Sequence, residues 1–214
     1  MRHIHPLQPI ILIILIVAMY YFRKQQKAKD GGAAAGPGEP RAAISRPKEP
    51  KEAKSPEAVY MDLRQKALQR MPGSLDVELQ ENQPYGLVME MDMSSSVVTL
   101  ACFADGDAGV YYKTGGGMKG GIGHETVRNA SREAIALTES VLPRMIQTTN
   151  FPLPGADRVR FYVLTPKGIF TTETSRQSLS EQSALSPLFY AGQEVVSQMR
   201  LVQEQKAGAV PVPA

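Results

Sequence analysis

A glycine-rich segment, residues 114–125, contains the residue types best suited to ligand chemistry in this chain. It reads TGGGMKGGIGHE, and six of the nine residues from 115 to 123 are glycine. Backbone N–H groups at the start of a helix can cradle an anion, and a lysine beside them adds positive charge. The candidate ligand-binding residues are therefore Gly115, Gly117, Lys119, Gly120, Gly121 and Gly123.

The same segment does not fit the known nucleotide-binding patterns. Gly115, Gly117 and Gly120 match G-x-G-x-x-G, but the preceding strand is the second arm of a predicted hairpin, not the first strand of a parallel unit. Lys119 also lacks the Gly-Lys-Ser/Thr setting of a P-loop. Two alternatives to anion binding stay open: a structural loop that needs unusual backbone angles, and a flexible loop that binds a partner.

No catalytic, metal-binding or cofactor-binding residue can be assigned from the sequence. His124 and Glu125 begin an H-E-x-x-H pattern, but position 128 is Arg128, and the other two histidines lie within the first five residues. Cys102 lies in an apolar strand, where we expect it to be buried and inert, and a single cysteine excludes an internal disulfide. The lack of such a motif favours a non-catalytic role over an enzymatic one.

The elements that must position the glycine-rich segment follow from the apolar spacing. Ser55 and Pro56 mark the start of a helix, whose expected apolar face carries Val59, Leu63, Ala67 and Met71. Alternation of apolar and polar residues in 87–93 predicts a half-buried strand with Glu90 on its polar side. Further strands are predicted at 97–104, 108–114, 159–165 and 169–174, with helices at 125–142 and 186–205.

This order, αβββαββα, predicts an α+β domain. Because tight turns join successive strands, such as Asp105-Gly106-Asp107, the sheet should be mainly antiparallel, with about five strands and three helices. The element order is loosely similar to that of profilin-like modules, including roadblock-type dimerisation domains. The similarity covers about 150 residues and concerns the order of elements alone.

Residues 7–23 are predicted to form a transmembrane anchor, after a short N-terminal tail at 1–6. Residues 7–22 are apolar except for Gln8 and end in the aromatic residues of 20–22, and a basic cluster begins at Arg23. A cleaved signal peptide or a buried core helix are the alternatives, but small residues are missing where a signal peptidase would cut. The basic cluster on the C-terminal side favours a cytoplasmic domain, with the exported side as the alternative.

Composition divides the remainder into a linker, a domain and a tail. Residues 24–54 are basic and then rich in Pro, Gly and Ala, which predicts a disordered linker; the domain spans 55–206, and 207–214 form a disordered tail. Residues 1–54 contain 10 basic and 4 acidic side chains, whereas 55–214 contain 14 basic and 17 acidic ones. An acidic domain argues against nucleic acid as a partner.

The sequence therefore predicts a single-pass membrane protein whose α+β domain acts as a protein-binding or assembly module. Its expected partners are the lipid bilayer, through residues 7–23, and a protein or a second copy of the chain. The alternative is a sensor of an anionic or phosphate-bearing ligand that uses residues 115–123.

Overall fold

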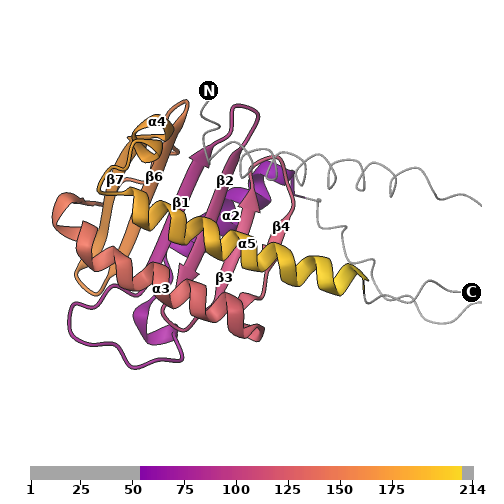
Figure 1. The fold of residues 1–214 in the computed structure, drawn as a ribbon, viewed down its shortest axis with the longest axis horizontal. Helices are drawn as coiled ribbons and strands as arrows, with labels where there is room; N and C mark the ends of the chain where they lie inside the picture. The colour runs from indigo at the N-terminus through magenta and orange to yellow at the C-terminus, as the bar shows by residue number, and fades with distance from the viewer. Residues whose placement is uncertain (1–53, 209–214) are drawn as a thin grey trace, which may run out of the picture. The chain divides into compact units, whose positions relative to one another are not determined.

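The computed structural model describes residues 54–208, and the helices and strands keep the labels of Figure 1. The predicted anchor, almost all of the linker and the last six residues lie outside this range. Among the described residues, no helix is both long and apolar enough to cross a membrane. The helices are α2 (Pro56–Leu68), α3 (Glu125–Val141), α4 (Arg176–Ser180) and α5 (Ser186–Gly208); the strands are β1 (Gly86–Asp92), β2 (Val97–Phe103), β3 (Ala108–Tyr112), β4 (Gly117–Lys119), β5 (Ile146–Thr148), β6 (Arg158–Thr165) and β7 (Gly168–Ser175).

The strands form one antiparallel sheet in the order β4-β3-β2-β1-β6-β7-β5. The α+β fold is thus confirmed, but the described residues contain seven strands and four helices, not five and three. The additional elements are β4 and β5, of three residues each, and α4, of five. Elements this short span too few residues to produce a periodic apolar pattern.

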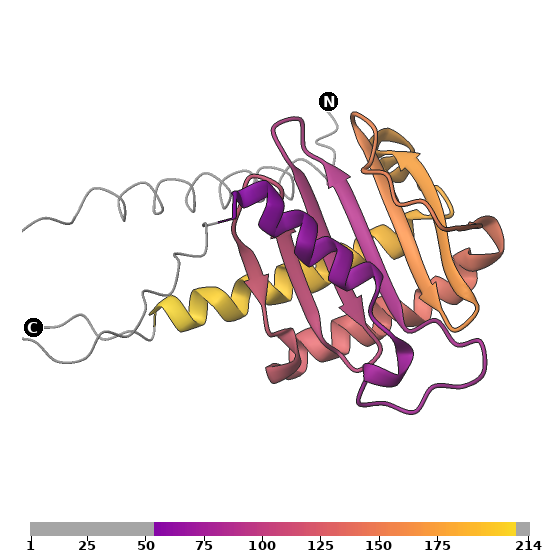
Figure 2. The ribbon, with the colours of Figure 1, turned by 180° about the vertical axis from the view of Figure 1, so that it is seen from behind.

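Helices cover both faces of the sheet. Helices α3 and α5 lie across one face (Figure 1), and α2 lies on the opposite face (Figure 2). On the α3/α5 face, α5 approaches β1 so closely that a Cβ atom at Gly192 would lie 2.6 Å from Cε of Met89. The alternation in β1 is as predicted, but the polar side is not open to solvent: Glu90 has no exposed surface, because α2 covers it.

Helix α2 begins where predicted but buries a different face. The Ser55 hydroxyl accepts a hydrogen bond from the backbone N–H of Ala58 at 3.2 Å, which caps the helix. The expected apolar face is wrong at two of its four positions, because Val59 is 43% and Met71 69% exposed. The buried residues of α2 are Tyr60, Arg64, Ala67 and Leu68. Counting only apolar residues missed this face because an arginine and a tyrosine hydroxyl lie on it.

The β2–β3 hairpin turn at Asp105-Gly106-Asp107 is confirmed. Gly106 has φ +90°, a conformation that favours glycine. Arg70, just after α2, donates to Asp105 at 2.7 Å and to Asp107 at 2.8 Å. Its guanidinium also lies 4.2 Å from the centre of the Phe103 ring. These contacts fasten the C-terminal end of α2 to the end of the sheet.

Candidate functional site

The glycine-rich segment is a turn, a strand and a second turn, rather than one open loop. Residues 113–116 turn the chain between β3 and β4, residues 117–119 are β4, and residues 121–123 form a 3-10 turn before α3. Gly117 has φ +155°, and a Cβ atom there would lie 2.2 Å from the carbonyl oxygen of Val110. The close approach of the Val110 backbone therefore explains why position 117 is glycine, as expected if the segment is a structural loop rather than an anion-binding one.

A pocket of about 160 Å³ lies between this segment and the C-terminal part of α5. Of the six candidate residues, Gly117, Lys119, Gly120 and Gly121 line it, and Gly115 and Gly123 do not. The contribution of α5 to this pocket could not be predicted from the sequence, because α5 lies about 80 residues further along the chain. The remaining lining residues are Met118, His124, Val127, Met199, Val202, Gln203 and Lys206.

The ammonium group of Lys119 points away from this pocket. Lys119 pairs with Gly109 across β3 and β4, so its side chain lies on the same face as Tyr111, which is the α2 face. Its Nζ atom is 5.9 Å from the centre of the Tyr111 ring. Met199 and Lys206 belong to α5, on the other face. Among the described residues that line this pocket, the lysine side chain on its own face of the sheet is therefore that of Lys206.

A second cluster of polar side chains lies buried beneath α2. Arg64 binds the Glu90 carboxylate with two hydrogen bonds, from Nε at 2.5 Å and from Nη2 at 2.9 Å. Their side chains are 5% and 0% exposed. The Tyr60 and Thr99 hydroxyls are 2.8 Å apart, and Thr99 also donates to Glu90 at 3.4 Å. A buried charge requires such partners, because the charge has been removed from water.

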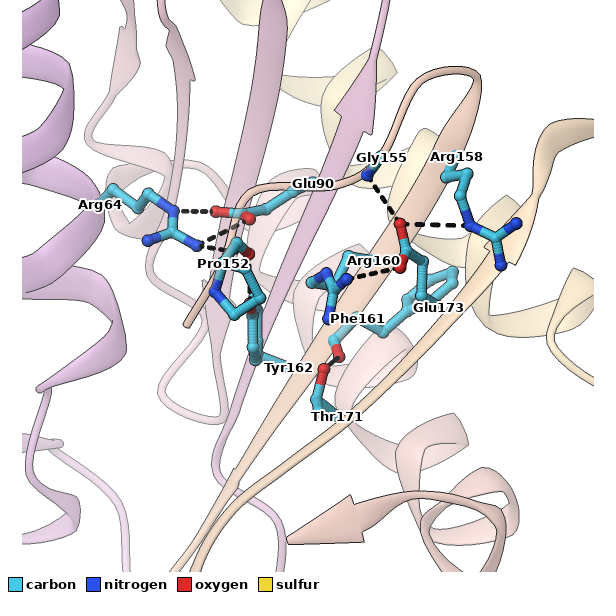
Figure 3. A network of polar contacts seen from close by, with 10 residues as sticks. All are labelled: Arg64, Glu90, Pro152, Gly155, Arg158, Arg160, Phe161, Tyr162, Thr171 and Glu173. Atoms are coloured by element: carbon cyan, nitrogen blue, oxygen red, sulfur yellow. Dashed lines mark hydrogen bonds and ion pairs between the residues drawn. The ribbon is translucent and has the colours of Figure 1, made fainter. Parts of the chain in front are cut away.

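The same cluster fixes the loop of residues 149–157 over the sheet (Figure 3). The Pro152 carbonyl accepts hydrogen bonds from Arg64 at 3.3 Å and from the Tyr162 hydroxyl at 2.6 Å. Glu173 accepts from the backbone N–H of Gly155 at 2.8 Å and from Arg160 at 2.5 Å. The loop and α2 are thus fastened to the same part of the sheet, a link between segments that periodicity did not predict.

Electrostatics in this cluster favour a structural role. Burial raises the pKa of the Glu90 carboxyl above its usual range, although the hydrogen bonds from Arg64 act in the opposite direction. Burial also raises the pKa values of Tyr60 and Tyr162 to about 12. The carboxylate is bonded on both oxygens, so its chemistry is to hold Arg64 and, through it, α2 and Pro152.

Cys102 and His124 lie as the sequence predicted. Cys102 has no exposed surface, and burial raises the pKa of its thiol to about 12, which keeps it protonated and unreactive. His124 occupies the N-cap position of α3 and Glu125 its first turn. Within residues 54–208, no group of three or more His, Cys, Asp or Glu side chains could hold a metal ion.

The two outer strands of the sheet differ in their protection. β4 carries the exposed Lys119, and Gly117, where the backbone of Val110 leaves no room for a Cβ atom; α5 extends past this edge (Figure 1). β5 reads Ile-Gln-Thr, and Ile146 is 71% exposed, the highest value for any large apolar side chain in the described part of the chain. Sheet edges of this kind are places where another chain can pair.

No protein-family model, no curated protein and no solved structure matches this chain.

Proposed function

We propose that this chain is a single-pass membrane protein, anchored through residues 7–23, whose α+β domain binds protein. The apolar run and the basic cluster that follows it support the anchor, and the same cluster supports a cytoplasmic domain. The domain begins at Ser55, after a linker rich in proline and glycine, so it can meet partners at a distance from the bilayer.

The observation that carries the binding role is the uncharged, exposed edge strand β5 with Ile146 on it. An exposed large apolar residue on an open strand edge favours association with another polypeptide. The ion pairs also favour a binding role over a catalytic one, because the carboxylates of Glu90, Asp105 and Glu173 are each held by an arginine. These groups stabilise the fold and are engaged in doing so.

Membrane anchoring is tested by washing membranes that contain the intact protein with concentrated salt. We expect the protein to stay in the membrane pellet with residues 7–23 uncleaved, because apolar burial in the bilayer does not depend on ionic strength. Release by salt, or a mature N-terminus beyond Phe22, would show that the anchor is wrong.

Protein binding is tested with a photo-crosslinking amino acid placed at position 146 of the intact chain in membranes. We expect a covalent adduct to a protein at this position. The matched control is position 133, because Glu133 is exposed on α3 and lies away from the sheet edge. Absence of any protein adduct at 146, or equal labelling at 133, contradicts a binding role for this edge.

A small anionic ligand is the second candidate, favoured by the pocket beside β4. Its lining combines glycine backbone at 120 and 121 with His124 and Lys206. Titration with inorganic phosphate and with nucleotides tests it in the intact protein. Replacing Lys206 by Ala should weaken binding about fivefold, the size expected for one exposed charge. Lys119→Ala is the matched control and should change nothing, because its ammonium lies on the other face. Without saturable binding to the wild type, this candidate is withdrawn.

A further inference from the structure

The chemistry of the β5 edge restricts what can pair with it. Ile146, Gln147 and Thr148 carry no charge, and none of them is proline or glycine. Natural sheets protect open edges with lysine, proline, bulges or covering elements. The β4 edge carries Lys119, and α5 extends past it, whereas within residues 54–208 the β5 edge is protected only by its shortness. The unprotected edge is therefore the one available for pairing.

We propose that β5 pairs antiparallel with β5 of a second copy of this chain, about a two-fold axis near Gln147. This inference rests on the proposed protein-binding function and names the partner. An antiparallel strand pair is self-complementary, because a two-fold axis brings the same N–H and C=O groups of both copies into register. Two identical uncharged strands also meet without repulsion between like charges. Every strand pair already in the sheet is antiparallel, so the second copy continues the existing pattern.

The register about Gln147 also covers the exposed isoleucine. With the axis at Gln147, Ile146 of one copy lies opposite Thr148 of the second copy, on the face that Ile146 shares with Thr171. A pair of β-branched residues at this position is favourable for a sheet. The exposed surface of Ile146 in the isolated domain is thereby buried at the interface.

The membrane anchor explains how so short an edge can associate. Three residues form few hydrogen bonds, so the pairing is weak between freely diffusing domains. Anchoring both copies in one bilayer raises their effective concentration, as a covalent tether does. The linker of the same chain is a poor substitute for the second strand, since Pro37, Pro40, Pro47 and Pro50 lack the N–H groups that a strand must donate.

Disulfide crosslinking of the intact protein in membranes tests the pairing. Gln147→Cys places the new thiols of two copies directly opposite each other, within reach of a disulfide. The native Cys102 is the only other cysteine and is fully buried, so the wild-type chain should form no disulfide-linked dimer. Lys119→Cys at the opposite edge is the matched control. On mild oxidation, Gln147→Cys should form at least about tenfold more linked dimer than Lys119→Cys.

Two further variants test the register, and a third tests the interface. Chains with Ile146→Cys and chains with Thr148→Cys should link to each other more than either links to itself, because the two-fold axis puts 146 opposite 148. Adding Ile146→Lys to Gln147→Cys should lower crosslinking, because it introduces positive charge into both copies at the interface.

Equal crosslinking at 147 and 119, or none at 147 while the protein stays folded, overturns the pairing of two copies. A photo-adduct at position 146 that contains a different protein also overturns it, but leaves the protein-binding function standing. The two proposals therefore fail separately.

Discussion

Removing the charge of Arg64 should destabilise the domain more than any change on the exposed side of α2. Arg64→Met keeps the length of the side chain but removes the two hydrogen bonds that Arg64 donates to the Glu90 carboxylate, which has no exposed surface and keeps only the longer bond from Thr99. Breaking one partner of a buried ion pair costs about 3 to 5 kcal/mol. Loss of the bond to Pro152 adds to this cost, because the 149–157 loop loses one of its two donors at that carbonyl.

The assay is urea unfolding of the domain fragment, followed by circular dichroism, for the single and double variants. Arg64→Met combined with Glu90→Leu should recover at least half of the loss, because an apolar pair of similar volume requires no compensation of charge. The matched control is Lys66→Ala on the same helix. Lys66 pairs with Asp62, but their side chains are 70% and 40% exposed, so the free energy of unfolding should hardly change.

The pH dependence of Arg64→Met gives an independent check. Without Arg64, burial raises the pKa of Glu90 still further above its value in the unfolded chain, so the folded protein holds a proton that the unfolded chain releases. The protonated Glu90 therefore contributes its full stabilisation below the pKa of Glu90 in the unfolded chain, and this contribution is lost as the pH rises through the pKa of Glu90 in the folded protein. The deficit relative to wild type should shrink from pH 8 to pH 5. A loss below about 1 kcal/mol, or a double variant no more stable than the single, would refute the reasoning.

Three further outcomes are expected. A fragment that starts at Ser55 should be soluble and unfold cooperatively, because Ser55 caps α2, the first helix of the described domain. A disordered circular dichroism spectrum would place the domain boundary elsewhere. Gly117→Val should lower the free energy of unfolding by about 2 kcal/mol or more, because the new Cβ atom would meet the Val110 carbonyl oxygen. Gly123→Ala should leave it unchanged, because no atom lies within 4 Å of the new Cβ. Equal melting temperatures for the two variants would contradict this. The free energy of unfolding should fall above about pH 9, because the Cys102 thiol ionises in the unfolded chain but stays protonated in the folded one, where its pKa is raised to about 12. The expected loss is about 2 kcal/mol by pH 10. In urea titrations, the free energy of unfolding of Cys102→Ala should depend less steeply on pH over this range.

Local signals in the sequence were sufficient for the long elements. Ser55 and Pro56 placed the start of α2, and the apolar spacing of 125–142 gave α3 to within one residue. Alternation around Glu90 identified β1, and Asp105-Gly106-Asp107 gave the β2–β3 hairpin. Each of these signals involves residues close together in the chain, where capping, turn geometry and side-chain period act directly. The α+β class followed from their order.

Contacts between distant segments decided the candidate sites. The pocket beside β4 needs Lys206 from α5, and the direction of Lys119 depends on its register with Gly109. The exposure of Ile146 follows from the position of β5 at the end of the sheet.

The pair of Arg64 and Glu90 shows most clearly what the sequence determined and what only the tertiary structure decided. By itself, the sequence determined that Arg64 lies on a helix and that Glu90 lies on the polar side of a strand. Only the tertiary structure decided that both are buried, because α2 covers that side of the sheet and brings the two charges within 2.5 Å. A charged residue is stable inside a protein only when an opposite charge reaches it, and here that partner lies 26 residues away along the chain. Local periodicity carries no information about a partner at that distance.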